Sequence, residues 1–344
     1  MQHARLGATT LKVSRVMLGT MARAESRPER RLAVLNAAID AGIDTVDTAP
    51  LYEFGDSERW VGQTLRNRPD RPIVCTKVGL RWDTSHGEIL FKRTDEAGSD
   101  QAVRKDSREA SVREQIESSR TRLGVDTIDL VQVHFRDVHT PLRDTMKALA
   151  DAVRAGEVRA VGICNFTLEE AQAAQRALGQ VPLASVQLSY SLLDRHVEDT
   201  ILPWARREHI AMLAYAPLAE GLLAGRRLDG GVTARWPLDA VYRAVDQHLR
   251  PVAYRHDASP AEVALAWLLA QPGVTAVIAG ASTPAQITAN ARAAELALTP
   301  AECEAIDRAF RRLGGKVDGV RRWARATKRK VKSALNAWRG PMVF

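Results

Sequence analysis

The sequence of 344 residues predicts an α/β protein with a closed (β/α)8, or TIM, barrel, and three observations support this fold class. Eight apolar, β-branched runs recur along the chain, and they are continuous rather than alternating, as in parallel strands covered on both faces. Segments with helical patterning separate these runs. The GxGxxG fingerprint of an open dinucleotide-binding sheet occurs nowhere in the chain. Repeated strand–helix alternation therefore favours a closed barrel.

The predicted elements follow this alternation from the first strand to the eighth. A hairpin is expected over residues 5–13, before the barrel begins. The expected strands span residues 16–20, 45–49, 73–77, 129–134, 160–165, 185–189, 211–216 and 274–280. The first helix is expected over 29–41 and ends before Gly42. Helix starts with capping-box spacing occur at 167–170 and 259–262, and Thr299 opens one further helix.

Two connections are longer than packing of a barrel requires. One covers residues 81–108, after the third strand, and the other covers 219–257, after the seventh. Long loops in compact domains are usually functional or disordered. Both follow the carboxyl ends of strands, on the face where barrels bind their ligands. We interpret them as walls of a substrate pocket, and the alternative is a pair of surface insertions.

Bulk composition describes an ordinary globular protein, with 45% hydrophobic and 26% charged residues. No apolar run reaches the roughly 18 residues that a membrane span needs. The first 15 residues lack the apolar segment of a signal peptide, so a cytoplasmic location is expected. Cys75, Cys164 and Cys303 are too far apart in sequence for a zinc pattern, and no metal is expected.

Excess positive charge is confined to the C-terminus. Residues 315–344 carry nine Lys/Arg and one acid, which accounts for the whole net charge of +8. The charge of the remaining chain is balanced, so a nucleic-acid partner is not expected. In residues 321–339, Trp323, Leu335 and Trp338 fall on one stripe of a predicted basic helix. We therefore divide the chain into a barrel, 1–313, and a basic amphipathic extension, 314–344, which docks on the barrel or binds an anionic surface or partner.

Four polar residues lie at or just after the ends of successive predicted strands. Asp47 lies near the end of the second run, with Tyr52 on the loop beyond it, and Lys77 and His134 close the third and fourth runs. In a parallel barrel the carboxyl ends of the strands meet at one mouth. A lone strand-end lysine is usually a solvated rim charge, and a lone histidine is usually a satisfied core residue. Four such residues at one mouth indicate a catalytic site instead.

These side chains suit proton transfer to an oxygen that gains negative charge. A phenol has an ordinary pKa near 10, and a neighbouring cation favours the phenolate and lowers that pKa. We therefore predict Tyr52 as general acid, Lys77 as the group that tunes it, Asp47 as the anchor of the lysine, and His134 as the residue that orients a carbonyl. None of these groups supplies electrons, so a redox cofactor is required.

Seven motifs resemble the aldo-keto reductase family, and they occur in family order over residues 4–313. The matching stretches are GIDTVDTAPLYEFGDSE, IVCTKVG, RLGVDTIDLVQVH, VRAVGICNF, SVQLSYSLLDR, LAYAPLAEGLL and VIAGASTPAQITAN. The resemblance implies the barrel fold and places the family's catalytic Asp, Tyr, Lys and His on Asp47, Tyr52, Lys77 and His134. It also implies metal-free, NAD(P)H-dependent reduction of a carbonyl, or the reverse oxidation of an alcohol, with transfer of the pro-R hydride.

The resemblance further implies the positions that hold the cofactor. Asn165 and Gln187, with Asp47 nearby, match residues at the carboxamide, and Tyr215 matches the ring that stacks on the nicotinamide. The backbone segments expected to line the nicotinamide and pyrophosphate contain Gly19, Thr20, Met21, Pro217, Leu218, Gly221 and Leu222. The residues expected to grip the adenosine end are Gly280, Ala281, Ser282, Thr283, Gln286 and Asn290. Backbone N–H groups at a helix start favour phosphate oxygens.

This sequence departs from the family pattern at two places. Cys164 stands where relatives often have a serine before the asparagine, and a thiol is a weaker hydrogen-bond partner. Gly280 and Gln286 stand where members with a strong NADPH preference often have lysine and arginine. NADP(H), the family default, is still expected over NAD(H), although only the neutral Ser282, Thr283 and Gln286 stand near a 2′-phosphate.

A second hypothesis from another class is a redox-sensing regulatory or interaction subunit with slow turnover, because some barrels of this family serve that role. A metal-dependent barrel hydrolase is less well supported, because clustered His/Asp ligands at strand ends are absent from the sequence pattern.

The sequence does not identify the carbonyl or alcohol substrate, which could be sugar-like, or the physiological direction or oligomeric state. An assay of aldehydes, ketones and sugars with both cofactors would discriminate the two hypotheses.

Overall fold

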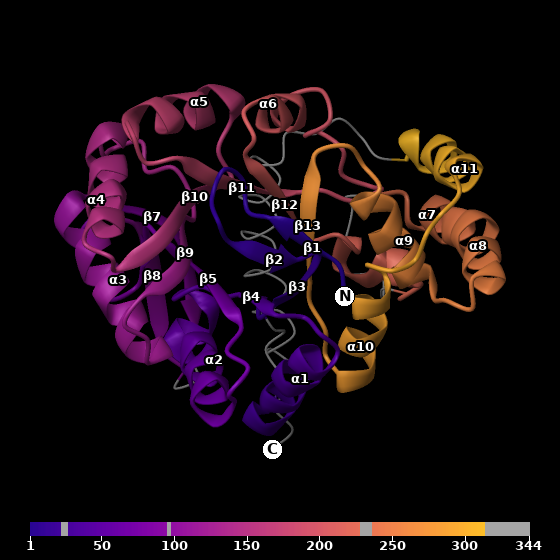
Figure 1. Ribbon diagram of the computed structural model, residues 1–344, viewed down its shortest axis with the longest axis horizontal. Helices are drawn as coiled ribbons and strands as arrows, with labels where there is room; N and C mark the ends of the chain where they lie inside the picture. The colour runs from indigo at the N-terminus through magenta and orange to yellow at the C-terminus, as the bar shows by residue number, and fades with distance from the viewer. Residues whose placement is uncertain (22–26, 95–97, 228–235, 314–344) are drawn as a thin grey trace, which may run out of the picture.

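The computed structural model of this chain describes residues 1–21, 27–94, 98–227 and 236–313. Parallel strands close a barrel with helices around it (Figure 1), which confirms the predicted fold class. The barrel strands are β3 (Val16–Gly19), β4 (Thr45–Asp47), β5 (Ile73–Val78), β9 (Ile128–Val133), β10 (Val158–Cys164), β11 (Leu183–Ser189), β12 (Ala211–Tyr215) and β13 (Val274–Ala279). β13 pairs with β3, where Ile278 lies opposite Met17, and this pairing closes the ring.

The helices lie outside the ring of strands (Figure 1). They are α1 (Pro28–Asp40), α2 (Asp56–Asn67), α3 (Glu109–Leu123), α4 (Leu142–Arg154), α5 (Leu168–Ala177), α6 (Ile201–Arg207), α9 (Pro260–Leu269), α10 (Pro284–Arg292) and α11 (Pro300–Arg311). Complete capping boxes form at Thr167 and Ser259, as the spacing predicted, and a third forms at Thr299, where one further helix was expected to start. Among the described helices, none is both long and apolar enough to cross a bilayer.

The predicted N-terminal hairpin is present as β1 (His3–Arg5) and β2 (Lys12–Ser14), which pair antiparallel. Leu6, Leu11 and Val13 from this hairpin are buried in one cluster with Met17 and Leu130 of the barrel strands. The hairpin precedes β3 and packs at the amino-terminal end of the strands. Apolar contacts with the hairpin therefore close the amino-terminal end of the barrel, and ligands can enter only at the carboxyl ends of the strands.

The connection after β5 is a small antiparallel sheet, which the sequence analysis did not predict. It consists of β6 (Leu80–Arg81), β7 (Glu88–Thr94) and β8 (Asp100–Lys105), in the order β6-β8-β7. Its polar, exposed strands lack the continuous apolar runs by which the barrel strands were identified. Val103 of this sheet is buried with Leu51 and Phe135, which neighbour Tyr52 and His134 in sequence. The sheet thus packs against the segments that follow β4 and β9.

The second long connection contains helical structure in its described parts. It forms η2 (Ala219–Ala224), α7 (Leu238–Ala244), the π-helical turn η3 (Val245–Leu249) and α8 (Arg250–Arg255). Leu222 and Leu249 are fully buried, so both ends of the connection are anchored in the core. The predicted basic extension over 314–344 lies outside the described residues.

Several predicted strand ends were wrong by one or two residues. β4 stops at Asp47 rather than at residue 49, β9 stops before His134, and β10 stops before Asn165, while β5 continues to Val78. Asn165 has a φ of 62°, and Ala216, just beyond β12, has a φ of 52°. Left-handed backbone cannot continue a strand. The strands therefore end where the chain turns outward at the mouth, which hydrophobic patterning does not indicate.

Candidate active site

Four elements deliver the predicted catalytic side chains to the barrel mouth. Asp47 is the last residue of β4, Lys77 is on β5, His134 follows β9, and Tyr52 begins the 3-10 helix η1 (Tyr52–Gly55). Asp47 is opposite Cys75 in the β4–β5 register, and Lys77 is opposite Gln132 in the β5–β9 register. Asp47, Lys77 and His134 are 3%, 1% and 7% exposed, so an ammonium and a carboxylate are both removed from water here.

The ammonium of Lys77 is fully occupied by three oxygen acceptors. Nζ donates to Asp47 Oδ2 at 2.7 Å, to the Thr48 carbonyl oxygen at 2.9 Å and to the Tyr52 hydroxyl at 3.3 Å. Burial lowers the pKa of Lys77, but the charge of Asp47 and further interactions raise it more, so its pKa lies above the ordinary value. Lys77 is therefore a permanent cation, held between a carboxylate and a phenol.

The phenol of Tyr52 keeps its proton more tightly than the sequence analysis expected. Burial raises the pKa of Tyr52 to about 12, although the charge of Lys77 pulls it down. The expected net lowering is wrong for the protein alone, because removal from water disfavours the phenolate by more than one nearby cation favours it. At neutral pH, Tyr52 is thus a neutral hydroxyl that can donate a proton.

His134 is a neutral imidazole at physiological pH. Burial, and then the charge of Lys77, hold the pKa of His134 well below its usual range. Its ring stacks on Phe135 with centroids 5.2 Å apart and meets Tyr52 edge-on at 6.1 Å. A neutral imidazole beside a phenol can donate a hydrogen bond without adding charge.

The side chains predicted at the carboxamide are hydrogen-bonded to Asp47 and to the backbone of His134. Gln187 Nε2 donates to Asp47 Oδ1 at 2.8 Å, so the two oxygens of Asp47 serve different partners. Asn165 Nδ2 donates to the His134 carbonyl oxygen at 3.1 Å, and the Tyr215 hydroxyl donates to Asn165 Oδ1 at 2.8 Å. Asn165, Gln187 and Tyr215 are thereby brought to the same mouth as the predicted catalytic residues.

Cys164 belongs to this network and is not a solvent-exposed thiol. Its Sγ lies 3.5 Å from Gln187 Oε1 and accepts from Asn165 Nδ2 at 3.1 Å. Burial raises the pKa of the Cys164 thiol, so it remains protonated and can hydrogen-bond to the amide oxygen of Gln187. Cys164 links the two amide side chains, although a thiol is a weak donor.

Backbone strain is concentrated at the mouth. Among described non-glycine residues, those with left-handed φ are Glu53, Phe54, Asn165, His209, Ala216, Ala219, Glu220 and Asp257. All but His209 and Asp257 lie in the segments that follow the carboxyl ends of β4, β10 and β12. Such conformations cost about 1–2 kcal/mol each and persist only where surrounding contacts require them. Their clustering supports a preorganised site at this face.

The segments expected along the nicotinamide and pyrophosphate lie beside this network. Thr20 donates from its backbone N–H to the Asp47 carbonyl oxygen at 2.9 Å, and Met21 is 59% exposed. A Cβ atom at Gly19 would come within 2.9 Å of the Ile278 γ-methyl group, so a larger residue there would require Ile278 to shift. Gly221 has a φ of 93°, and the side chain of Arg226, which the sequence analysis passed over, packs against it.

The residues expected at the adenosine end form the start of α10. Thr283 Oγ1 accepts from the Gln286 N–H, and Gln286 Oε1 accepts from the Ser282 N–H at 2.7 Å. Asn290 is buried and donates to the Gly280 carbonyl oxygen at 3.4 Å, while Ala281 packs on the core. Residues 280–286 contain no lysine or arginine.

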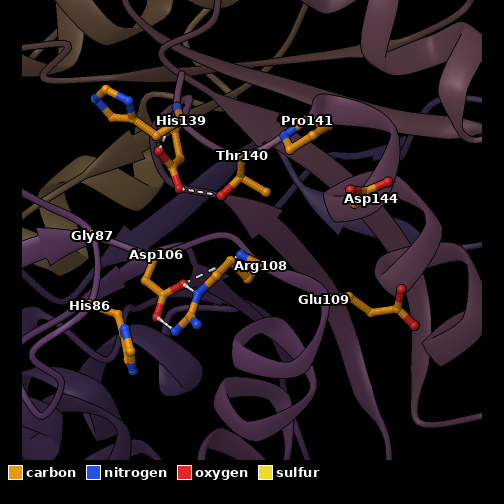
Figure 2. A pocket seen from close by; sticks show the side chains of 10 residues that line it. His86, Gly87, Asp106, Arg108, Glu109, His139, Thr140, Pro141 and Asp144 are labelled. Atoms are coloured by element: carbon orange, nitrogen blue, oxygen red, sulfur yellow. Dashed lines mark hydrogen bonds and ion pairs between the residues drawn. The ribbon is translucent and has the colours of Figure 1, made fainter.

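A separate cavity of about 450 Å³ lies beside the mouth and contains none of the predicted site residues. It is lined by residues of the β6–β7 turn, the start of α3 and the β9–α4 loop, including His86, Asp106, Arg108, Asp137 and Thr140 (Figure 2). Dashed lines in Figure 2 mark the pairing of Asp106 with Arg108. Thr140 also donates from its hydroxyl to Asp137 Oδ2 at 2.6 Å. Glu109, which also lines the cavity, pairs with Arg113 and Lys147 outside it. No group of three or more His, Cys, Asp or Glu positioned for a metal occurs in the described part of the chain.

The fold and the mouth together define a barrel oxidoreductase with an Asp–Lys–Tyr–His cluster. The model of the aldo/keto reductase family matches residues 15–311. The NADH-specific methylglyoxal reductase of Escherichia coli is 31% identical over 88% of this chain and 96% of its own length. An aldo-keto reductase of Bacillus subtilis is 30% identical over 84% of this chain and 87% of its own length.

Solved structures agree with the sequence relatives. The glycerol dehydrogenase of Gluconobacter oxydans matches with a TM-score of 0.78 and 31% identity, over 92% of this chain and 96% of its own. The holo form of an aldo-keto reductase from Bacillus halodurans matches with a TM-score of 0.76 and 27% identity, over 92% of this chain and 97% of its own. The chain belongs to the aldo/keto reductase family, as its motifs indicated. It is an oxidoreductase of the carbonyl–alcohol class that uses a nicotinamide cofactor.

Proposed function

We propose that this protein reduces a small aldehyde or ketone to the alcohol, with Tyr52 as the proton donor. The observation that carries the proposal is the position of Lys77 Nζ, 2.7 Å from Asp47 Oδ2 and 3.3 Å from the Tyr52 hydroxyl at the barrel mouth. A buried cation in this position stabilises a nascent phenolate on Tyr52. At neutral pH, Tyr52, with a pKa of about 12, holds the proton that reduction requires.

Each side chain then has one task. The Tyr52 hydroxyl gives its proton to the carbonyl oxygen of the substrate, and Lys77 stabilises the phenolate that remains. Asp47 keeps Lys77 charged and in place through the contact at 2.7 Å. His134, neutral because of burial, orients the carbonyl by a hydrogen bond to its oxygen. When bound, the reduced nicotinamide supplies the hydride.

The residues near the mouth fit a nicotinamide. Gln187 Nε2 uses one of its hydrogens on Asp47, and Asn165 Oδ1 accepts one hydrogen bond from Tyr215. One amide hydrogen of Gln187 and one lone pair of Asn165 therefore stay available for a carboxamide. Arg226, packed on Gly221, offers a cation beside the segment expected at the pyrophosphate. The backbone N–H groups at the start of α10 favour phosphate oxygens.

A small carbonyl compound such as methylglyoxal is the substrate class that we favour. The Escherichia coli relative is named for methylglyoxal and the Gluconobacter oxydans structure for glycerol, and both are small molecules. The test is a panel of aldehydes, ketones and sugars assayed with NADH and NADPH. Turnover of a small aldehyde supports the proposal. Cofactor binding without turnover on any carbonyl would favour the redox-sensing subunit instead.

The pH dependence should differ between the two directions of reaction. Reduction requires protonated Tyr52 and neutral His134. The pKa of Tyr52 is about 12 and that of His134 lies well below its usual value, so neither group changes its protonation state between about pH 6.5 and 9. We therefore expect kcat/KM for aldehyde reduction to stay flat across this range. Alcohol oxidation needs the phenolate, so its kcat/KM should rise by up to about tenfold per pH unit. A fall in reduction centred between pH 6.5 and 9 would contradict the assignment of Tyr52.

Discrimination between the cofactors should be small. The family leads us to propose some preference for NADPH, but only neutral side chains stand at residues 280–286, and the named Escherichia coli relative is NADH-specific. Gln286→Arg should raise the NADPH/NADH ratio of kcat/KM by about tenfold or more, because a charge-assisted bond to a 2′-phosphate is formed. Gln286→Met is the matched control, because it removes the bond to Ser282 without adding charge. A strong NADPH preference in the wild type would reveal a basic partner elsewhere.

A further inference from the structure

The turn directly after Tyr52 has a strained backbone. Glu53, Phe54 and Gly55 have successive φ values of 49°, 52° and 98°. Glycine adopts left-handed backbone readily, but glutamate and phenylalanine do so at a cost. Local sequence therefore does not explain this turn, and contacts of the two side chains must hold it.

Glu53 is held by an ion pair that spans two helices. Its carboxylate lies 3.2 Å from Nη1 of Arg31 on α1, and the two side chains are only 8% and 10% exposed. The Arg31 guanidinium also stacks over Trp60 of α2, 4.2 Å from the ring centroid. Burial raises the pKa of the Glu53 carboxyl, and the charges of Arg31 and Arg93 oppose this. The Arg31 side chain thus joins α1, α2 and the turn.

Phe54 is held from the other side by the small sheet at the mouth. Its ring meets Trp82 edge-on with centroids 5.5 Å apart, and the Arg93 guanidinium lies 5.4 Å from its centroid. The two residues with unfavourable φ are therefore anchored to different parts of the fold. Tyr52, immediately before them, hydrogen-bonds through its backbone N–H to the Ala49 carbonyl oxygen at 3.0 Å.

We propose that Glu53 is a positioning residue whose ion pair with Arg31 fixes the strained turn and thereby keeps the Tyr52 hydroxyl beside Lys77. The inference rests on the proposed function, in which Tyr52 is the proton donor. Without the pair, the turn relaxes toward right-handed φ, and the hydroxyl leaves its position 3.3 Å from Lys77 Nζ. Small displacements of a reacting group lower turnover strongly.

The first test is Glu53→Gln, which keeps the shape of the side chain and removes its charge. With the fastest aldehyde of the panel and saturating NADH, we expect kcat to fall about tenfold. The Kd for NADH and the KM for the aldehyde should change less than about twofold, because neither is bound by Glu53. A purely structural role would lower the melting temperature and leave kcat unchanged, so a fall in kcat at constant KM distinguishes the two.

Glu302→Gln is the matched control. Glu302 on α11 is 13% exposed and pairs with Arg255 at 3.0 Å, on the side of the barrel opposite α2 (Figure 1). This variant should lower the melting temperature and leave kcat within about twofold of the wild type. An equal loss of kcat in both variants would overturn the inference, because the loss would then follow from stability alone.

Arg31→Met and the double variant Arg31→Met/Glu53→Gln complete a cycle. Arg31→Met leaves a buried carboxylate without its partner, so we expect kcat at least as low as in Glu53→Gln. The double variant removes both charges of the pair, so it should fold even where a single variant does not. Its kcat should be no lower than that of Glu53→Gln, because the ion pair is already lost in that single variant. If Tyr52→Phe is inactive but these variants turn over at the wild-type rate, the inference fails and the proposed function stands. If Tyr52→Phe keeps its activity, the proposed function itself fails.

Discussion

Tyr52→Phe is expected to reduce aldehydes about 10²–10⁴-fold more slowly than the wild type, which is the range that general acid catalysis supplies. The substitution removes one hydroxyl and leaves the ring, so the edge-on contact with His134 at 6.1 Å is kept. Lys77 loses its bond of 3.3 Å to that hydroxyl but keeps Asp47 and the Thr48 carbonyl oxygen. The change therefore acts on the proton donor and spares the surrounding structure.

Three measurements make this result specific. Single-turnover kinetics report the chemical step, quenching of protein fluorescence by NADH reports cofactor affinity, and a melting curve reports folding. Cofactor affinity should stay within about twofold of the wild type, because the substitution leaves the residues expected to hold the cofactor unchanged. Tyr254→Phe is the matched control, because Tyr254 on α8 is 90% exposed and lies outside the site. Retention of more than about a tenth of the activity in Tyr52→Phe would reject Tyr52 as the acid.

Lys77→Met is expected to lose both turnover and stability. Lys77 and Asp47 are 1% and 4% exposed at the side chain, so the substitution leaves a buried carboxylate without its cation. Loss of one partner of a buried ion pair costs about 3–5 kcal/mol of unfolding free energy. The pKa of Tyr52 should rise further, because Lys77 is the cation that lowers it. We expect kcat to fall by at least about 10²-fold, since the phenolate is no longer stabilised.

The double variant Asp47→Asn/Lys77→Met separates the two losses. With both charges removed, Gln187 can still hydrogen-bond the side chain at position 47, which it contacts at 2.8 Å in the wild type. Unfolding in urea should therefore show that much of the lost free energy returns, because no uncompensated charge is buried. Turnover should stay low, because neither substitution restores the cation. Recovery of turnover in the double variant would show that Lys77 serves folding alone.

The sequence by itself determined the barrel and the identity of the four residues at its mouth. Continuous β-branched runs and capping boxes are local patterns, and they predicted the strands that close the ring and the helices that start at Thr167, Ser259 and Thr299. Asp47 and Lys77 lie at the ends of such runs, so parallel topology alone brings them together. The motifs around them also sufficed to indicate the family.

Only the tertiary structure decided how these residues behave. Whether Lys77 or burial sets the pKa of Tyr52 depends on how much water the fold removes, and burial raises that pKa to about 12. The strained turn at Glu53 and Phe54 depends on Arg31, Trp82 and Arg93, which come from other segments of the chain. Patterning reports which face of a segment is buried, but desolvation and contacts between distant segments arise only when the chain has packed.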